Sequence, residues 1–151
     1  MALEKYTMIA GLALFVFFVA EIITLFNYMS TPPADQFVAV EPEPKIFQFI
    51  SLSIAPALIM TGMSFLLAKK YGSKHIAIAI IGGGLIVLCG MIYANTMLED
   101  IEEQYLVDTV KITPPLFMGI SIPVIILGFI LLRIKKQKPR KRYYDDSSGI
   151  V

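Results

Sequence analysis

Four long runs of apolar residues, separated by short charged segments, dominate this sequence. Each run approaches or exceeds the roughly 18–20 residues that an α-helix needs to cross a bilayer. Charged residues make up only 17% of the chain and the mean hydropathy is +0.71, which excludes disorder, a coiled coil, a disulfide scaffold and most soluble enzymes. We therefore expect an all-α integral membrane protein over residues 1–134, a short-looped up-down bundle of four transmembrane helices. The predicted spans cover approximately Tyr6–Tyr28, Ile46–Ala68, His75–Met97 and Pro114–Ile134.

Turn-forming residues mark the ends of these spans. Gly72 is placed to end the second helix, and Ser73 is placed to cap the third. The segment Thr113–Pro115 predicts the start of the fourth helix, because proline is tolerated where the amide has no partner. In the first outer loop, the alternating prolines of Glu41–Pro44 predict an extended and stiff path.

The distribution of basic residues predicts the orientation of the bundle. With the N-terminus in the cytoplasm, the cytoplasmic segments contain all of the 13 Lys and Arg residues except Lys45 and Lys111. Positive charge next to a span resists translocation, so both termini are expected in the cytoplasm. The expected location is the cell (plasma) membrane as a multi-pass protein. An excess of Ile over Leu and a lysine-leaning tail favour a prokaryotic or archaeal cell.

A basic cytoplasmic tail, residues 135–151, follows the fourth span. Its cationic side chains either contact lipid head groups or hold the topology, since each gains about 1 kcal/mol near an anionic leaflet. This role leaves no need for nucleic acid as a partner. The residues concerned are Lys135, Lys136, Lys138, Arg140, Lys141 and Arg142.

The densest acidic cluster lies in the second outer loop and consists of Glu99, Asp100, Glu102 and Glu103. Carboxylates at this spacing can share a hard cation such as Ca²⁺. However, the loop lacks the alternating Asp or Asn residues and the turn glycine of a dedicated calcium loop. A solvated acidic face is the main interpretation, and partner docking and weak cation binding are the alternatives.

Glu21 lies well inside the first span, where a carboxylate is costly. Its side chain is therefore expected to face the bundle, to be protonated, or both. Counting equal depths along the other helices places Ser53 and Ser121 at a similar level, with Tyr93 one turn above. These residues predict a polar layer within the outer half of the bundle.

Two prolines, Pro56 and Pro123, fall close to this layer and are expected to kink their helices. Each proline frees a backbone carbonyl, which adds an acceptor to the layer. Two interpretations of the layer stay open. In the first, Glu21 hydrogen-bonds to a serine or a carbonyl and holds helices together, at about 0.6 kcal/mol per bond. In the second, the layer binds a proton, a cation or a small polar solute.

Small residues predict where the helices pack closely. The third span contains Gly82, Gly83, Gly84 and Gly90, whose lack of a side chain lets another backbone approach. We therefore expect the third helix to be the central and most buried one. The same glycine-rich helix offers a surface to which other subunits could dock.

Residue types that usually carry catalysis or bind metals are scarce in the sequence. His75 is the one histidine and Cys89 the one cysteine. Along one helix they lie roughly 21 Å apart, so they cannot share an ion within one chain. The sequence contains no His pair, Cys-x-x-Cys, glycine-rich phosphate loop or Ser–His–acid set. Neither a resident metal, nor a cofactor, nor a catalytic activity of the chain itself is expected.

Two functions compatible with this architecture remain. The first is a non-catalytic accessory subunit of a larger membrane complex, such as a respiratory or metal-dependent oxidase assembly, or a component that assembles with copies of itself. It would dock through the glycine-rich helices and the acidic outer loops. The alternative is a small oligomeric transporter or channel that uses the layer around Glu21 for a proton, a cation or a small solute.

Overall fold

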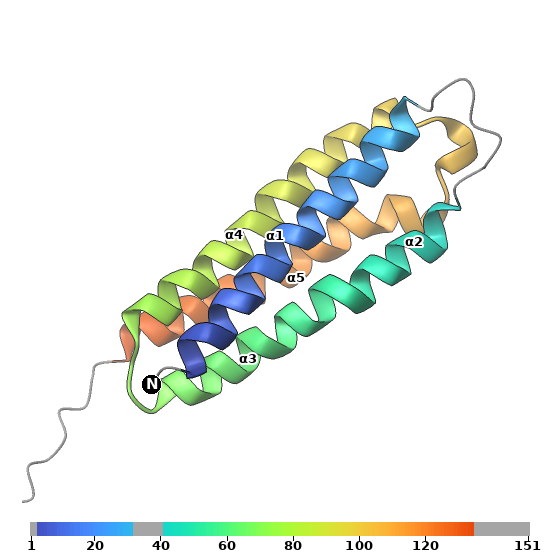
Figure 1. Cartoon of the computed structure of the whole chain (residues 1–151). Coiled ribbons are helices and arrows are strands. Elements are labelled where there is room, and N and C mark those ends of the chain that lie inside the picture. The colour runs from blue at the N-terminus through green and yellow to red at the C-terminus, as the bar shows by residue number, and fades with distance from the viewer. Residues whose placement is uncertain (1–2, 32–40, 135–151) are drawn as a thin grey trace, which may run out of the picture.

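The protein is described here by a computed structural model that covers residues 3–31 and 41–134. These residues form four long helical rods that run alternately up and down in one bundle (Figure 1). The second rod is built from two helices and an intervening turn, as detailed below. The α-helices are α1 (Leu3–Ser30), α2 (Pro42–Phe49), α3 (Ala55–Lys69), α4 (Lys74–Met97) and α5 (Asp108–Arg133).

All four rods are long and apolar enough to cross a membrane. This finding confirms the predicted all-helical class and the number of apolar spans. In the second rod, a π-helical turn over Ile50–Ile54 joins α2 to α3. In the third, a 3₁₀ turn over Leu98–Asp100 extends α4, and another 3₁₀ turn follows at Glu103–Tyr105.

Helix α5 begins at Asp108, so the prediction that Thr113–Pro115 starts the fourth helix was wrong. Both prolines lie inside α5, where each removes one backbone hydrogen bond. The side chain of Val110 is fully buried in the first turn, and this burial favours the helical start at Asp108. The Thr113 hydroxyl donates a hydrogen bond of 2.6 Å to the carbonyl of Thr109, and the prolines leave the carbonyls of Val110 and Lys111 without their usual donors.

The prediction of an extended path over Glu41–Pro44 was also wrong, because α2 begins at Pro42. Proline is well suited to the first helical position, where its fixed φ is already helical and its missing N–H costs nothing. Ile46 is fully buried and anchors this short helix against the bundle. The rest of the first loop, residues 32–40, lies outside the described residues, as does the basic tail at 135–151.

A short turn at Lys70–Ser73 connects α3 to α4. Gly72 has a φ of 61°, a backbone conformation that favours glycine, and its N–H donates to the carbonyl of Ala68 at 2.8 Å. Gly72 therefore ends α3 as predicted. Ser73 occupies the N-cap position of α4, but its hydroxyl makes no capping hydrogen bond in the described structure.

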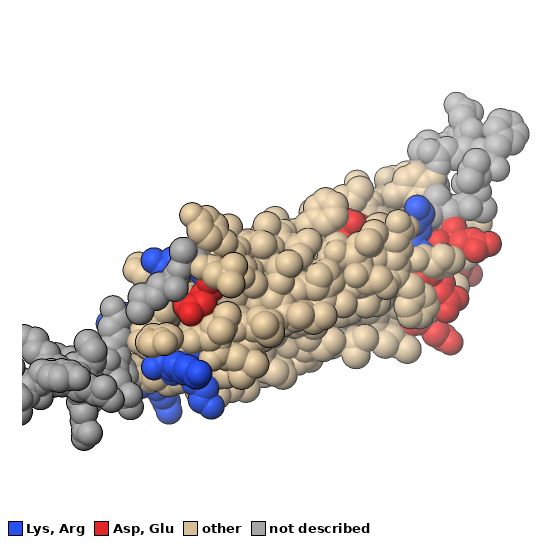
Figure 2. Space-filling model, turned by 60° about the horizontal axis from the view of Figure 1, so that its bottom comes forward, with Lys and Arg blue, Asp and Glu red and all other residues tan. Residues whose placement is uncertain are grey.

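The charged side chains separate to opposite ends of the bundle, and its long middle is almost free of charge on the face seen in Figure 2. We call the end that carries Lys5, Lys69, Lys70, Lys74 and Arg133 the basic end. The opposite end, at the two loops that follow α1 and α4, is the acidic end. It carries Glu41, Glu43, Glu99, Asp100, Glu102, Glu103 and Asp108, together with Lys45 and Lys111.

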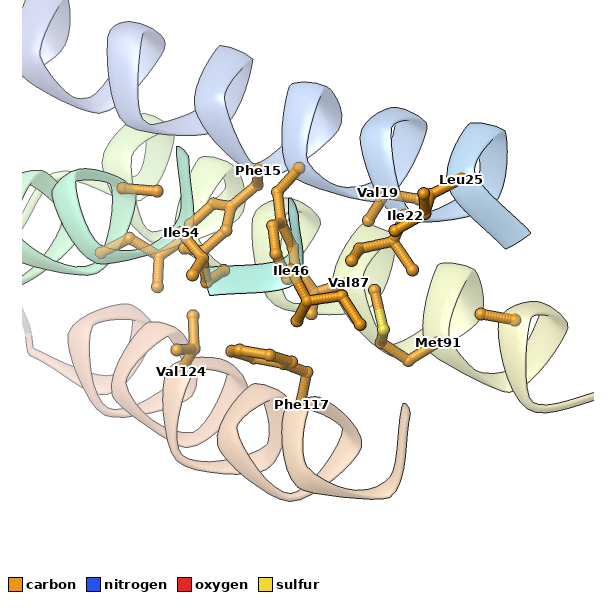
Figure 3. Packing of buried hydrophobic residues seen from close by; sticks show 14 of the residues in the cluster. Phe15, Val19, Ile22, Leu25, Ile46, Ile54, Val87, Met91, Phe117 and Val124 are labelled. Carbon is orange, nitrogen blue, oxygen red and sulfur yellow. The ribbon is translucent and has the colours of Figure 1, made fainter. Parts of the chain in front are cut away.

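Large apolar side chains fill the centre of the bundle. Helix α1 packs against α3 and α4, and α5 packs along α4. Phe18 of α1 and Phe117 of α5 meet across the bundle in an edge-to-face arrangement, with ring centroids 4.8 Å apart. Figure 3 shows Phe15, Phe117 and Val124 converging on this centre from α1 and α5.

The glycines of α4 differ in what they face. Gly83 lies against Phe15, and Gly90 lies against Val19, both on α1. Gly84 lies against α5, where an added Cβ would sit 2.6 Å from Cγ1 of Ile125 and 3.3 Å from the carbonyl oxygen of Ser121. Gly82 is the exception, since an added Cβ would meet nothing within 4 Å. Three of the four glycines therefore let α4 approach its neighbours within the chain, and Gly82 does not.

Gly84→Ala is expected to destabilise the bundle by about 1–3 kcal/mol, because the new methyl group would push against α5. Thermal unfolding of the purified protein in detergent measures the effect. Gly82→Ala is the matched control, and it should be neutral or stabilising by up to about 1 kcal/mol, since alanine favours helix over glycine. Equal melting temperatures of the two variants would contradict the close packing of α4 on α5.

Candidate functional site

Glu21 lies on α1 at the edge of the face that packs into the bundle, and its side chain is half-buried. The neighbouring residue Ile22 is fully buried, whereas Ala20 on the other side is exposed. The Ser53 hydroxyl, from the turn that precedes α3, donates a hydrogen bond of 2.6 Å to Oε2 of Glu21. The structure thus brings together two residues that are far apart in sequence and that were matched by depth alone.

The π-helical turn explains how Ser53 reaches this position. Within it, the N–H of Ala55 donates to the carbonyl of Ile50, five residues back. The extra residue in the turn lets α3 start at Ala55, so that Pro56 falls in the first turn of α3. Pro56 has no N–H to donate to the preceding turn, and the π-helical turn accommodates it, so that the rod continues from Pro42 to Lys69. Ser53 lies in the widened turn with its side chain fully buried.

A groove of about 420 Å³ opens beside Glu21, between α1 and α2. Ala20, Thr24 and Lys45 are exposed, so the groove lies on the outer surface of the bundle. The Thr24 hydroxyl donates to the carbonyl of Ala20 on its own helix. We call this surface the Glu21 groove. It is lined by Phe17, Ala20, Glu21, Thr24, Leu25, Tyr28, Lys45 and Phe49.

The predicted polar layer is smaller than expected, because Ser121 and Tyr93 do not join it. Ser121 is buried, but its hydroxyl donates at 2.6 Å to the carbonyl of Met118 on α5 itself. Tyr93 is 55% exposed on the outer face of α4. Equal depth places residues at one level, but rotation about each helix axis decides which of them meet. Pro123 lies on an exposed face within α5, which continues through it without a break.

The sequence did not predict the positions of two further polar residues, one in the Glu21 groove and one in the interior. Lys45 lines the Glu21 groove because α2 begins early enough to carry it there. Thr61 of α3 is almost fully buried, and its hydroxyl has no hydrogen-bond partner within the described structure. It lies beside Gly11 of α1, where the missing side chain allows close approach. Pro42 was the one signal for Lys45, because a helix that begins at this proline carries Lys45 to the Glu21 groove.

The acidic residues Glu99, Asp100, Glu102 and Glu103 are all exposed at the acidic end. Within residues 3–31 and 41–134, no group of three or more His, Cys, Asp or Glu side chains is arranged to hold a metal ion. A hydrogen bond of 3.2 Å from the Thr109 hydroxyl to Glu43 ties α2 to α5 nearby. Beside it lies an open cavity of about 650 Å³ between the start of α2 and the loop around Tyr105.

The hydrogen bond between Ser53 and Glu21 is expected to stabilise the bundle modestly. Ser53→Ala should cost about 0.6 kcal/mol and at most about 1.7 kcal/mol, the range for such bonds in membrane proteins. Glu21→Gln should cost less, because its amide oxygen still accepts from the serine. A double-mutant cycle of Ser53→Ala with Glu21→Ala, followed by thermal unfolding in detergent, measures the coupling.

Ser51→Ala is the matched control, because the exposed Ser51 hydroxyl bonds only to Phe47 of its own helix. It should leave the melting temperature nearly unchanged. A coupling energy of zero between positions 53 and 21 would show that the two side chains do not interact in the folded protein.

The chemistry available in the Glu21 groove is that of one carboxyl group, held by a serine, with a lysine in the same groove. Such a groove can accept a hydrogen-bond donor or a cation from outside the bundle. No protein-family model matches the chain, and searches of curated proteins and of solved structures found no match.

Proposed function

We propose that this protein is a non-catalytic subunit of a larger membrane complex, and that a helix of a partner subunit covers the Glu21 groove. The proposal rests on the direction in which the Glu21 side chain is accessible, which is the outer surface of the bundle. Its carboxyl group lies on a groove at the outer surface of the bundle and not in the packed interior.

Glu21 lies deep in the proposed span, so exposing its carboxyl group to lipid would cost free energy if the bundle had no partner. The residue lies about 14 Å from the end of α1 at Ser30, at 1.5 Å per residue. Ionisable residues at such depth almost always face protein or water, because lipid chains cannot hydrogen-bond to them. Ser53 supplies one hydrogen bond to Glu21. A partner helix with a hydroxyl, amide or cationic side chain would supply the rest and would exclude lipid from the groove.

The acidic end supports the same proposal. Its exposed carboxylates form a strongly negative surface that includes Glu41 and Glu43 at the start of α2, the helix that also lines the Glu21 groove through Lys45 and Phe49. A partner with a basic outer segment would be attracted to this surface and oriented by it. The filled centre of the bundle, with Phe15, Phe18 and Phe26 fully buried, favours a packing role over an axial pathway.

The orientation that we propose places the basic end in the cytoplasm of a plasma-membrane protein. Lys69, Lys70 and Lys74 flank the turn between α3 and α4, and Arg133 lies at the end of α5. Basic residues in such short segments resist translocation. The acidic end then faces outward, where a partner's outer segment could reach it.

Ala20→Phe is expected to release the partner, because the new ring would occupy the Glu21 groove. Extraction of the native membrane in mild detergent, followed by affinity isolation of the tagged chain, measures which proteins co-migrate in a fixed ratio. Ala13→Phe is the matched control, since Ala13 is exposed on the same face of α1, two turns nearer the basic end. It should retain the partner.

Migration of the wild-type chain alone would contradict the proposal, and so would equal retention by both variants. The transporter alternative makes the opposite prediction. In vesicles that contain only this chain, a Glu21-dependent flux of protons or cations, abolished in Glu21→Gln, would favour transport over a subunit role.

The proposed orientation predicts which end reacts with a membrane-impermeant maleimide in intact cells. In a Cys89→Ser background, a cysteine introduced by Gln104→Cys should react from outside, because Gln104 is exposed at the acidic end. Ser73→Cys, in the turn at the basic end, should react only after the cells are permeabilised. The reverse labelling pattern would contradict the proposed orientation and show that the basic end faces outward.

A further inference from the structure

We infer that the basic end of the bundle carries a binding site for one anionic phospholipid, between the first turns of α1 and α4. The inference rests on the proposed insertion in a membrane but not on the proposed partner. It concerns a part of the molecule that is distant from the Glu21 groove, at the opposite end of α1.

A cavity of about 530 Å³ lies at this end, where the turn after α3 faces the start of α1. Three basic side chains line it: Lys5 from α1, and Lys74 and His75 from α4. Glu4 is the one carboxylate among the lining residues, so the two lysines leave an excess of positive charge. Such a cavity has the charge that a phosphate group requires.

The backbone at the start of α4 adds hydrogen-bond donors. The first intrahelical bond at this end runs from the N–H of Ala77 to the carbonyl of Ser73. The three preceding amides, of residues 74–76, therefore have no acceptor within the helix. All three residues line the cavity, and the hydroxyl of Ser73 makes no capping bond to compete with a ligand. Free amides at a helix start favour an anion.

An apolar groove of about 120 Å³ continues from the cavity along the bundle. The two share Lys5, His75 and Ile76, so they are contiguous. Beyond these residues the groove runs between Met8 and Ile9 of α1 and Ala79 of α4, one turn deeper into the apolar segment. A basic cavity that opens into an apolar groove matches a phosphate head group followed by the first carbons of an acyl chain, and a soluble phosphate would use only the first part.

The position suits a lipid of the membrane surface. Lys5 and Lys74 stand at the first turns of two apolar helices, where the head groups of a bilayer would lie. The exposed Tyr6 and Tyr71 are nearby in sequence, and tyrosine is enriched at this level of membrane proteins. In other proteins, basic pockets between transmembrane helices on the cytoplasmic side bind anionic head groups, and this is the side that we propose for the basic end.

Native mass spectrometry of the full chain in detergent tests the site. The added probes are phosphatidylglycerol, phosphatidylcholine with the same acyl chains, and glycerol phosphate as the soluble head group. The wild type is expected to retain one phosphatidylglycerol about tenfold more strongly than phosphatidylcholine. Lys5→Gln/Lys74→Gln should lose this preference, and each single change should reduce it.

Two charge-matched controls separate the cavity from general attraction to basic residues. Lys69→Gln/Lys70→Gln removes exposed charges at the same end that do not line the cavity, and Lys135→Gln/Lys136→Gln removes charges of the tail. Both should keep the preference for phosphatidylglycerol. If either control loses as much as the cavity variant, the lipid is held by diffuse charge and the inference is overturned.

The apolar groove is tested by Ile9→Gln, which places a polar group on its exposed rim. This change should weaken phosphatidylglycerol retention several-fold. Val16→Gln is the control, because Val16 is exposed on the same face of α1 two turns away. If glycerol phosphate binds as strongly as the lipid and Ile9→Gln has no effect, the site holds a free phosphate and not a phospholipid. A retained lipid site with no co-migrating partner would overturn the proposed function alone.

Discussion

In the membrane setting that we propose, the surrounding lipid offers no hydrogen bonds to the polypeptide, and the rest of the structure meets that constraint. Every backbone amide in the apolar segments must find its partner within its own helix, which accounts for four unbroken rods. The exceptions are local and lie at prolines. The π-helical turn before Pro56 accommodates the proline within a continuous rod, and α5 continues through Pro114, Pro115 and Pro123.

The same constraint requires polar side chains inside the bundle to find hydrogen-bond partners within the protein. Ser53, Ser64 and Ser121 are buried, and each hydroxyl donates to an acceptor within the bundle. Glu21 differs from these residues because one hydrogen bond satisfies only part of a carboxyl group. The carboxyl group can form further hydrogen bonds, and it faces a surface groove. These unmade hydrogen bonds are the physical reason for proposing that another helix lies there.

The two ends of the bundle carry different chemistry for the same reason. Most charged side chains lie at the two ends of the bundle, and they are mainly basic at one end and mainly acidic at the other (Figure 2). At the acidic end they form an exposed surface suited to a protein partner. At the basic end they line a cavity that continues into an apolar groove, which suits an amphipathic ligand. One charge pattern thus supports two different binding proposals.

The sequence alone determined the helical class, the four apolar spans, the separation of charge and the helix end at Gly72, because hydropathy and glycine conformation act locally along the chain. It also matched Glu21 with Ser53 by depth. Packing in three dimensions keeps Ser121 and Tyr93 apart from them and turns Gly82 away from its neighbours. Those outcomes depend on how far each helix is rotated about its axis and on which helices adjoin. Rotation is set by packing between segments distant in sequence, which a pattern read along one segment does not contain.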